Sequence, residues 1–181
     1  MHELYTFTES RVKGKRPCGR DGCAAVIIGQ SLYLFGGDRN KLALRDVSLD
    51  FWAGTVTALI GPSGCGKSTL LYVLSTLDTD YTGKIFLDNE DLSKKSKNDL
   101  ASIRNEKIGF VFQFHYLLPE FTVLENIALP ALKQGKKDIE QINEEALEIL
   151  QLLGLKDQAL KHANKLSGGQ QQRVAIARAL I

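Results

Sequence analysis

The nine residues "GPSGCGKST", from Gly61 to Thr69, limit what this chain can fold into more than any other stretch. They place three glycines, a lysine and two adjacent hydroxyl groups directly after the apolar run "VTALI". Glycine has no Cβ, so successive backbone N–H groups of such a loop can turn toward one ligand. The following segment, "KSTLLYVLSTL", carries leucines at helical spacing. A strand, a glycine loop and a helix in this order predict an anion-binding helix start.

The loop also satisfies the pattern G-x-x-x-x-G-K-[ST], through Gly61, Gly66, Lys67 and Ser68. In such a loop the lysine reaches the β- and γ-phosphates, and the hydroxyl ligates the Mg²⁺ that bridges them. A glycine-rich turn that contains a lysine by chance is the alternative, and the flanking strand and helix argue against it. The sequence therefore predicts nucleoside triphosphate binding. The loop alone does not separate a transporter motor from a GTPase or a kinase.

A second glycine motif, "LSGGQ" from Leu166 to Gln170, follows roughly a hundred residues later at a predicted loop-to-helix junction. Ser167 is placed to act as the N-cap of the helix "QQQRVAIARALI", and Gly168 and Gly169 permit close approach to the N–H groups at its start. Taken alone, such a motif would favour a capped helix that binds nothing.

Composition narrows the class of protein. The chain has 181 residues, 44% of them hydrophobic, which is enough for one sizeable core and a small second lobe. A formal charge of +2 is too small to predict general affinity for nucleic acid, so we expect no nucleic-acid partner. No apolar run approaches the roughly 20 residues of a membrane span, and the charged start lacks a signal peptide's apolar middle. These features predict an intracellular protein.

The chain is expected to have an irregular start and an α/β body. Residues 1–30 read as a basic, poorly ordered leader, with an RNA or lipid contact as the less favoured interpretation. From residue 31 the hydrophobic patterns predict alternating strands and helices. The expected strands are "SLYLF", a half-buried antiparallel "DVSLDF", a fully covered "TVTALI", an antiparallel "TGKIFLD" and a buried "IGFVFQ" that ends at Gln113; "KNDLASIRNEK" is expected to be a polar helix.

The second half of the sequence is predicted to be helical. Thr122 and Glu125 have the spacing of a capping box, in which each side chain satisfies a backbone N–H at the helix start. Gly154 stands where the next helix should stop. The apolar stripe of that helix consists of Ile139, Ile142, Ala146, Ile149, Leu150 and Leu153, and its Glu144, Glu145 and Glu148 are expected to face solvent.

The two glycine motifs together resemble the ATP-binding cassette family, whose signature is LSGGQ and whose phosphate loop reads like Gly61 to Thr69. The resemblance covers residues 31–181. It implies a P-loop NTPase core sheet with an antiparallel β subdomain and an α-helical subdomain at about 114–170, in an incomplete cassette. The residues implied to contact ATP are Phe35, Gly61, Pro62, Ser63, Gly64, Cys65, Gly66, Lys67, Ser68, Thr69, Ser167, Gly168, Gly169 and Gln170.

The resemblance also implies individual roles. Gln113 matches the family's Q-loop glutamine, which is associated with the Mg²⁺ and attacking-water region. The resemblance therefore implies that Lys67 and Gln113 are the catalytic residues. It also implies that Ser68 and Gln113 contact the metal. Phe35 falls where the family usually carries a tyrosine that stacks on adenine, and phenylalanine keeps the stacking face. In the family two cassettes pair head to tail, so Ser167 to Gln170 are expected to act on ATP held by a second subunit.

The stretch "FQFHYLLPEFTVLENIALP" is similar to the lipoprotein-releasing subunits of the family, with the macrolide exporters as close relatives. The segment from Phe112 to Pro119 is therefore expected to receive an integral membrane permease, with ordinary loop packing as the alternative. Such a subunit would be an ATPase lying on the inner face of the cell membrane. Two other functions stay open: a soluble ABC ATPase that acts on nucleic acid contacts, and a non-hydrolytic ATP-binding remnant.

The sequence departs from the family after "ARALI", where a complete cassette continues into a strand ending in Asp-Glu and on to a later histidine. We therefore expect the 181-residue chain alone to bind ATP weakly and to turn it over negligibly. The strand that would lie beside "TVTALI" is also not in the sequence, which should expose Val56, Ala58 and Ile60 or leave an unpaired sheet edge.

Overall fold

The computed structural model describes residues 23–28, 31–36 and 47–181, and the chain divides into two compact units. The first unit ends at Gln113, and the second runs from Phe114 to Ile181. The helical subdomain expected at about residues 114–170 stays a prediction. Within the described ranges no helix combines the length and apolar character needed to cross a bilayer.

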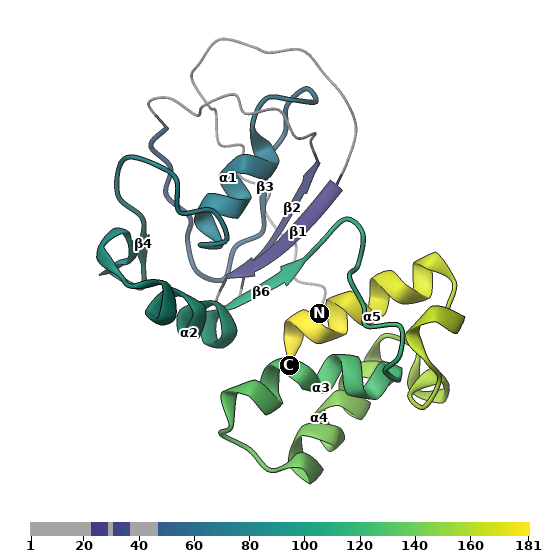
Figure 1. Ribbon diagram of the computed structural model, residues 1–181. Helices are drawn as coiled ribbons and strands as arrows, with labels where there is room; N and C mark the ends of the chain where they lie inside the picture. The colour runs from purple at the N-terminus through teal and green to yellow at the C-terminus, as the bar shows by residue number, and fades with distance from the viewer. Residues whose placement is uncertain (1–22, 29–30, 37–46) are drawn as a thin grey trace, which may run out of the picture. The chain divides into compact units, whose positions relative to one another are not determined.

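The first unit contains a four-stranded mixed sheet with the order β3-β2-β1-β6 (Figure 1). Strand β1 is antiparallel to both of its neighbours, and β2 is parallel to β3. Strands β2, β3 and β6 therefore run in one direction, and their carboxyl ends share one edge of the sheet. The bounds are β1 Cys23–Ile28, β2 Ser31–Gly36, β3 Thr57–Ala58 and β6 Ile108–Val111.

Helix α1 (Lys67–Leu74) contributes Leu71 to the core of this unit, where it packs with Leu59 from the residue after β3. The half-buried side chains around this pair come from α1, from β6 and from the segment before β3: Phe51, Leu70, Ile108 and Phe110. The rings of Tyr72 and Phe110 stack with centroids 5.8 Å apart, so α1 is fastened to β6. This packing fixes the direction in which α1, and therefore the loop before it, leaves the sheet.

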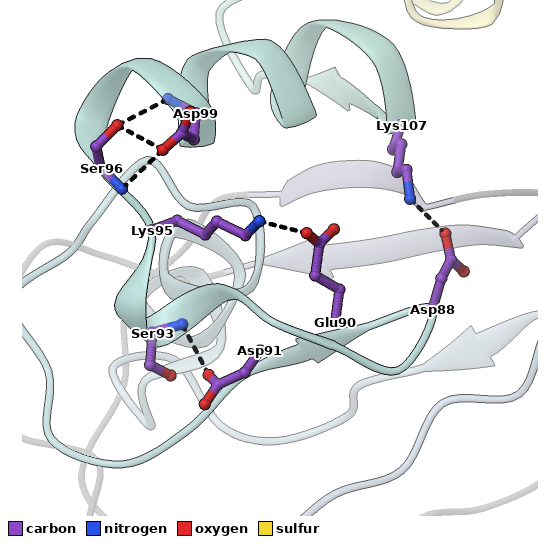
Figure 2. A network of polar contacts seen from close by, with 8 residues as sticks. All are labelled: Asp88, Glu90, Asp91, Ser93, Lys95, Ser96, Asp99 and Lys107. Carbon is purple, nitrogen blue, oxygen red and sulfur yellow. Dashed lines mark hydrogen bonds and ion pairs between the residues drawn. The ribbon is translucent and has the colours of Figure 1, made fainter.

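A polar network joins a small hairpin to helix α2 (Lys97–Lys107), as Figure 2 shows. Strands β4 (Phe86–Leu87) and β5 (Glu90–Asp91) are linked by two residues with positive φ, as tight hairpins require. Lys95 pairs with Glu90, and Lys107 Nζ lies 3.0 Å from Asp88 Oδ2. A short 3-10 turn, η1 (Leu92–Lys94), precedes α2. At the start of α2, Ser96 and Asp99 form a capping box.

The second unit is helical, with α3 (Val123–Gln134), α4 (Ile139–Leu152) and α5 (Gly168–Leu180) packed around one core. Two 3-10 turns, η2 (Lys156–Gln158) and η3 (Ala163–Lys165), connect α4 to α5. Each of the three helices begins with a capping box, and the box predicted at Thr122 and Glu125 is confirmed. The fully buried side chains of the core include Val123, Ile127, Ala146, Leu150 and Val174.

Five predicted helices and two predicted strands are present; α2 has the predicted ends, and the ends of the others are shifted. Helix α1 stops at Leu74, so Leu77 lies beyond it and is exposed. Ile142, Ala146 and Leu150 of the predicted stripe are buried, whereas Ile139 at the helix start is exposed. Gly154 follows α4 with φ of +66° and ends it as predicted.

Three strand predictions need correction. "DVSLDF" forms no strand over its described residues 47–51; its alternation is matched by no hydrogen-bonded partner there. "TVTALI" pairs only at Thr57–Ala58, on the sheet edge, and its last residue, Ile60, is 85% exposed instead of covered. In "IGFVFQ" only Val111 is buried.

Two further expectations concern this sheet. Val56 and Ala58 are half-buried, Ile60 is exposed, and β3 forms an edge of the described sheet. Strand β1 lies inside the stretch that was assigned to the leader, because its apolar run "CAAVII" pairs along its whole length with β2. The rest of that stretch, residues 1–22 and 29–30, lies outside the described residues.

Candidate functional site

The loop between β3 and α1 is shaped by glycines with left-handed backbone angles. Gly64 has φ of +77°, and Gly66, the N-cap of α1, has φ of +91° with no side-chain cap bond. Other residues adopt such angles only with strain. The first backbone hydrogen bond of the helix runs from Leu70 N to Gly66 O at 2.9 Å. The N–H groups of the preceding first turn therefore have no carbonyl of their own helix to bond.

Gly61 is fixed by a close approach within the loop. A Cβ at this position would lie 2.8 Å from the Sγ of Cys65, closer than real Cβ contacts. The loop is also closed by a bond from Cys65 N to Pro62 O of 3.4 Å. The loop thus keeps Cys65 close to both Gly61 and Pro62.

The ammonium group of Lys67 lies over this folded loop. Its Nζ donates to the carbonyl oxygens of Gly61 and Pro62, each at 2.8 Å, and lies 3.5 Å from Cys65 Sγ. The first turn of α1 contains no acidic residue that could neutralise the lysine or the helix dipole. The loop therefore combines a positive side chain with the positive end of a helix, which favours an anion.

Ser63 supplies the most direct indication of a ligand. Its Oγ is buried and finds no hydrogen-bond partner among the described residues. A buried hydroxyl without a partner costs about 1–3 kcal/mol, so such groups call for an explanation. The hydroxyl lies inside a loop whose glycines have left-handed backbone angles, next to a lysine. These features fit a multiply charged phosphate group, which supplies several acceptor oxygens at once.

The sheet brings two other predicted site residues to the edge that carries this loop. Gly61 lies three residues after the end of β3, Gln113 two residues after β6, and Phe35 is the penultimate residue of β2. Because these strands are parallel, Phe35 lies at the carboxyl edge and Gly61 and Gln113 lie just beyond it, where α/β sheets bind ligands. Gln113 is exposed. The side chain of Phe35 lies outside the part that the structure describes.

The second glycine motif forms the start of α5 in the helical unit. Ser167 Oγ accepts from Gln170 N at 3.4 Å, and Ser167 N donates to Gln170 Oε1 at 2.9 Å. The predicted N-cap is therefore confirmed, and Gln170 completes the box. Gly168 and Gly169 are the first two residues of the helix, are exposed, and have no positive φ. A Cβ at either glycine would meet nothing within 4 Å.

The segment after Gln113 exposes several apolar side chains in the helical unit. Phe114 is 70% exposed, Tyr116 55% and Leu118 41%. Two polar residues that the sequence analysis did not single out bond to this segment, Arg178 of α5 and Asn126 of α3. A signal was present, because each stands at helical spacing from buried apolar residues: Arg178 is four residues after Val174, and Asn126 three after Val123.

The acidic residues of α4 lie mostly at its surface. Glu144 and Glu148 are exposed as expected, and Glu145 is half-buried and pairs with Lys137 at 2.6 Å. Among the described residues no group of three or more histidine, cysteine, aspartate or glutamate side chains is placed to hold a metal ion.

Comparison with protein families matches residues 44–181 to the family described as ABC transporter. Among curated proteins, the chain is 47% identical over 137 residues to a lipoprotein-releasing system ATP-binding protein LolD 1 of Chlorobium chlorochromatii, covering 76% of this chain and 56% of the relative. It is 48% identical over 138 residues to the LolD protein of Bacteroides fragilis, covering 76% of this chain and 63% of that protein. The chain thus spans less than two thirds of these relatives.

Two solved structures of the cassette MJ0796 are also similar. The first is the dimeric structure of this bacterial ABC transporter cassette, with 45% identity, a TM-score of 0.62, and coverage of 66% of this chain and 53% of the other. The second is a dimeric post-hydrolysis state bound to ADP and Pi, with 37% identity, a TM-score of 0.71, and coverage of 87% and 68%. These likenesses confirm the predicted P-loop cassette fold.

Proposed function

This chain belongs to the ABC transporter family, and from that premise we propose that it is the ATP-binding and ATP-hydrolysing subunit of a membrane transporter of the lipoprotein-releasing type. One observation carries the proposal: the loop from Gly61 to Gly66 holds a lysine ammonium over itself and buries a Ser63 hydroxyl without a partner. A triphosphate supplies the acceptor oxygens that this arrangement needs. The names of the relatives support the choice of transporter class.

Each residue of the loop has a distinct task in this proposal. The left-handed glycines let backbone N–H groups face the phosphates, and Lys67 brings its charge to the β- and γ-phosphates. Ser68 and Gln113 would supply two oxygen ligands to Mg²⁺, a cation that binds oxygen and that would neutralise developing charge on the phosphates. Phe35 would stack on the adenine ring.

Hydrolysis in this proposal requires two copies of the cassette. Ser167 to Gln170 form a capped, exposed helix start in the second unit, whereas the phosphate loop belongs to the first. We infer that the helix start closes on ATP held by the loop of a second subunit, arranged head to tail. ATP would then favour the closed pair, and its hydrolysis would allow reopening.

The membrane partner is the remaining element. We propose that an integral membrane permease docks on the segment from Phe112 to Pro119, where three large apolar side chains are exposed. The subunit would then lie in the cytoplasm on the inner face of the cell membrane. An apolar surface of this kind fits a partner that buries it on binding.

ATP turnover and ATP binding by the full-length gene product test the site. In the Lys67→Ala variant we expect ATP turnover to fall at least about a hundredfold, because the charge facing the phosphates is lost. Lys84→Ala, which removes an exposed lysine of the same unit, serves as the matched control. Equal turnover in both variants would contradict the assigned site, and binding without turnover in the wild type would favour the non-hydrolytic alternative.

A photo-crosslinking amino acid at Tyr116 tests the partner. We expect it to capture an integral membrane protein, identified by mass spectrometry, whereas the same probe at the exposed Leu152 of α4 should not. Capture of ribosomal proteins or DNA at Tyr116 instead would support the soluble class of ABC ATPase and contradict the transporter.

A further inference from the structure

The exposed segment after Gln113 contains an unusual backbone turn. His115 and Tyr116 are consecutive non-glycine residues with φ of +51° and +46°. Left-handed angles are unfavourable for residues with a Cβ, and a pair of them persists only when neighbouring groups hold the backbone in place. The turn therefore depends on contacts from elsewhere in the helical unit.

Arg178, in the last turn of α5, provides that contact. Its guanidinium donates from Nη1 to the carbonyl oxygen of Tyr116 at 2.9 Å and from Nη2 to that of His115 at 2.7 Å. The planar fork thus binds two adjacent carbonyl groups that only this backbone conformation turns toward it. Burial lowers the pKa of the Arg178 guanidinium, but arginine stays charged near neutral pH, so both bonds are charge-assisted.

Asn126 of α3 fastens the downstream end of the same segment. Its side chain is fully buried, with Oδ1 accepting from Leu118 N at 2.7 Å and Nδ2 donating to Leu118 O at 3.0 Å. Nδ2 also donates to Thr122 O at 2.9 Å. The backbone from His115 to Leu118 is therefore held from two helices.

The result is an apolar surface with a fixed shape. The rings of Phe114 and Tyr116 meet edge to face with centroids 6.5 Å apart, although both side chains are largely exposed. A restrained backbone with exposed aromatic rings favours binding, because little conformational entropy is lost when a partner covers the surface. The half-buried Arg178 and the buried Asn126 thus hold a backbone that presents exposed aromatic rings.

We propose that Arg178 is a positioning residue that sets the His115–Tyr116 turn for the membrane partner, and that α5 thereby connects the partner surface with the helix start at Ser167. This inference rests on the proposed function for both ends. Ser167 caps the first turn of α5 and Arg178 lies in the last, in a helix of 13 residues and about 20 Å. A rigid helix of this length moves its two ends together.

Hydrogen exchange of the full-length protein tests the positioning itself. In Arg178→Ala the Tyr116 and Leu118 amides should exchange at least about tenfold faster, because two charge-assisted bonds are removed. Arg104→Ala is the matched control, since Arg104 binds Thr76 O at 2.8 Å, and Thr76 also has a positive φ, of +58°. Unchanged exchange in Arg178→Ala would overturn the inference, and so would the same increase in Arg104→Ala.

Binding to the membrane protein captured through Tyr116, purified in detergent, tests the consequence. We expect about tenfold weaker binding by Arg178→Ala, a smaller loss in Arg178→Lys, and binding by Arg104→Ala close to that of the wild type. His115→Gly added to Arg178→Ala should restore part of the affinity, since glycine adopts the turn without strain. A purely stabilising role would leave the affinity of folded Arg178→Ala equal to that of the wild type.

The outcomes separate the two proposals. Wild-type protein that does not bind the captured membrane protein contradicts the proposed function. If Arg178→Ala binds this membrane protein as tightly as the wild type does, and circular dichroism shows both proteins to be folded, only the role of Arg178 is overturned.

Discussion

The glycines at the start of α1 have left-handed backbone angles that would strain other residues. At the start of α5 both glycines lie within the helix, and neither has a positive φ. Gly66 has φ of +91° and caps α1 without a side chain. At α5 the side chains of Ser167 and Gln170 cap the helix, and Gly168 and Gly169 have free space around them. The first helix start needs glycine for its conformation, and the second does not.

The difference indicates where the reason for each glycine lies. Replacing alanine by glycine inside a helix costs about 1 kcal/mol, so two glycines in the first turn of α5 weaken the helix. Nothing within the described chain requires them, because a Cβ at either position meets no atom within 4 Å. Close approach of a second molecule to the helix start is consistent with these two glycines and with the proposed composite site.

The largest expected effect is at α1. Gly66→Ala forces a residue with a Cβ to φ near +91°, and we expect ATP affinity to fall at least about a hundredfold, with a loss of about 1–2 kcal/mol in unfolding free energy. Fluorescent-nucleotide titration and urea denaturation measure the two quantities. Gly135→Ala, with φ of +66° after α3, should lose stability alone. Full nucleotide binding by Gly66→Ala would remove the contrast between the two helix starts.

At α5 the two effects should have opposite signs. Gly168→Ala and Gly169→Ala should each raise the unfolding free energy by about 1 kcal/mol, because alanine favours the helix. ATP turnover of the dimer should nevertheless fall about tenfold or more, since a methyl group blocks close approach to the N–H groups. If the variants are more stable and equally active, the α5 glycines have no role in the composite site.

The smallest effect concerns the helix caps. Hydrogen bonds from the Thr122 backbone and hydroxyl hold the pKa of Glu125 below its usual value. The carboxylate therefore stabilises the start of α3 at neutral pH, and this stabilisation is lost as pH falls through the lowered pKa. The box at α5 uses Gln170, which does not titrate. Below pH of about 4.3, amide exchange at the start of α3 should rise relative to that of α5. Glu125→Gln should abolish this pH dependence.

The sequence predicted the features whose signals are local. The phosphate loop, the caps at Thr122 and Ser167, and the stop at Gly154 each depend on residues within a few positions, and the structure contains the loop, both caps and the stop. The family resemblance added the cassette fold, which the comparisons confirm. The assigned roles of the site residues stay predictions.

The features that were missed depend on distant partners. Strand β1 was assigned to a leader because only its pairing with β2 and β6 makes it part of the sheet. Residues Val47 to Phe51 alternate like a strand and form none, since alternation provides no partner. The helical spacing of Arg178 from Val174 indicates its position on the packed face of α5, but its bond partners lie 62 and 63 residues back along the chain, and periodicity does not identify them.

Lys67 has one more consequence for affinity. Its long side chain would lose about 0.5–1.5 kcal/mol of rotational freedom if a ligand had to immobilise it. The two carbonyl groups of Gly61 and Pro62 already restrain the ammonium group when no ligand is present. That entropy is therefore lost during folding, and the loop meets its anion with the charge preorganised.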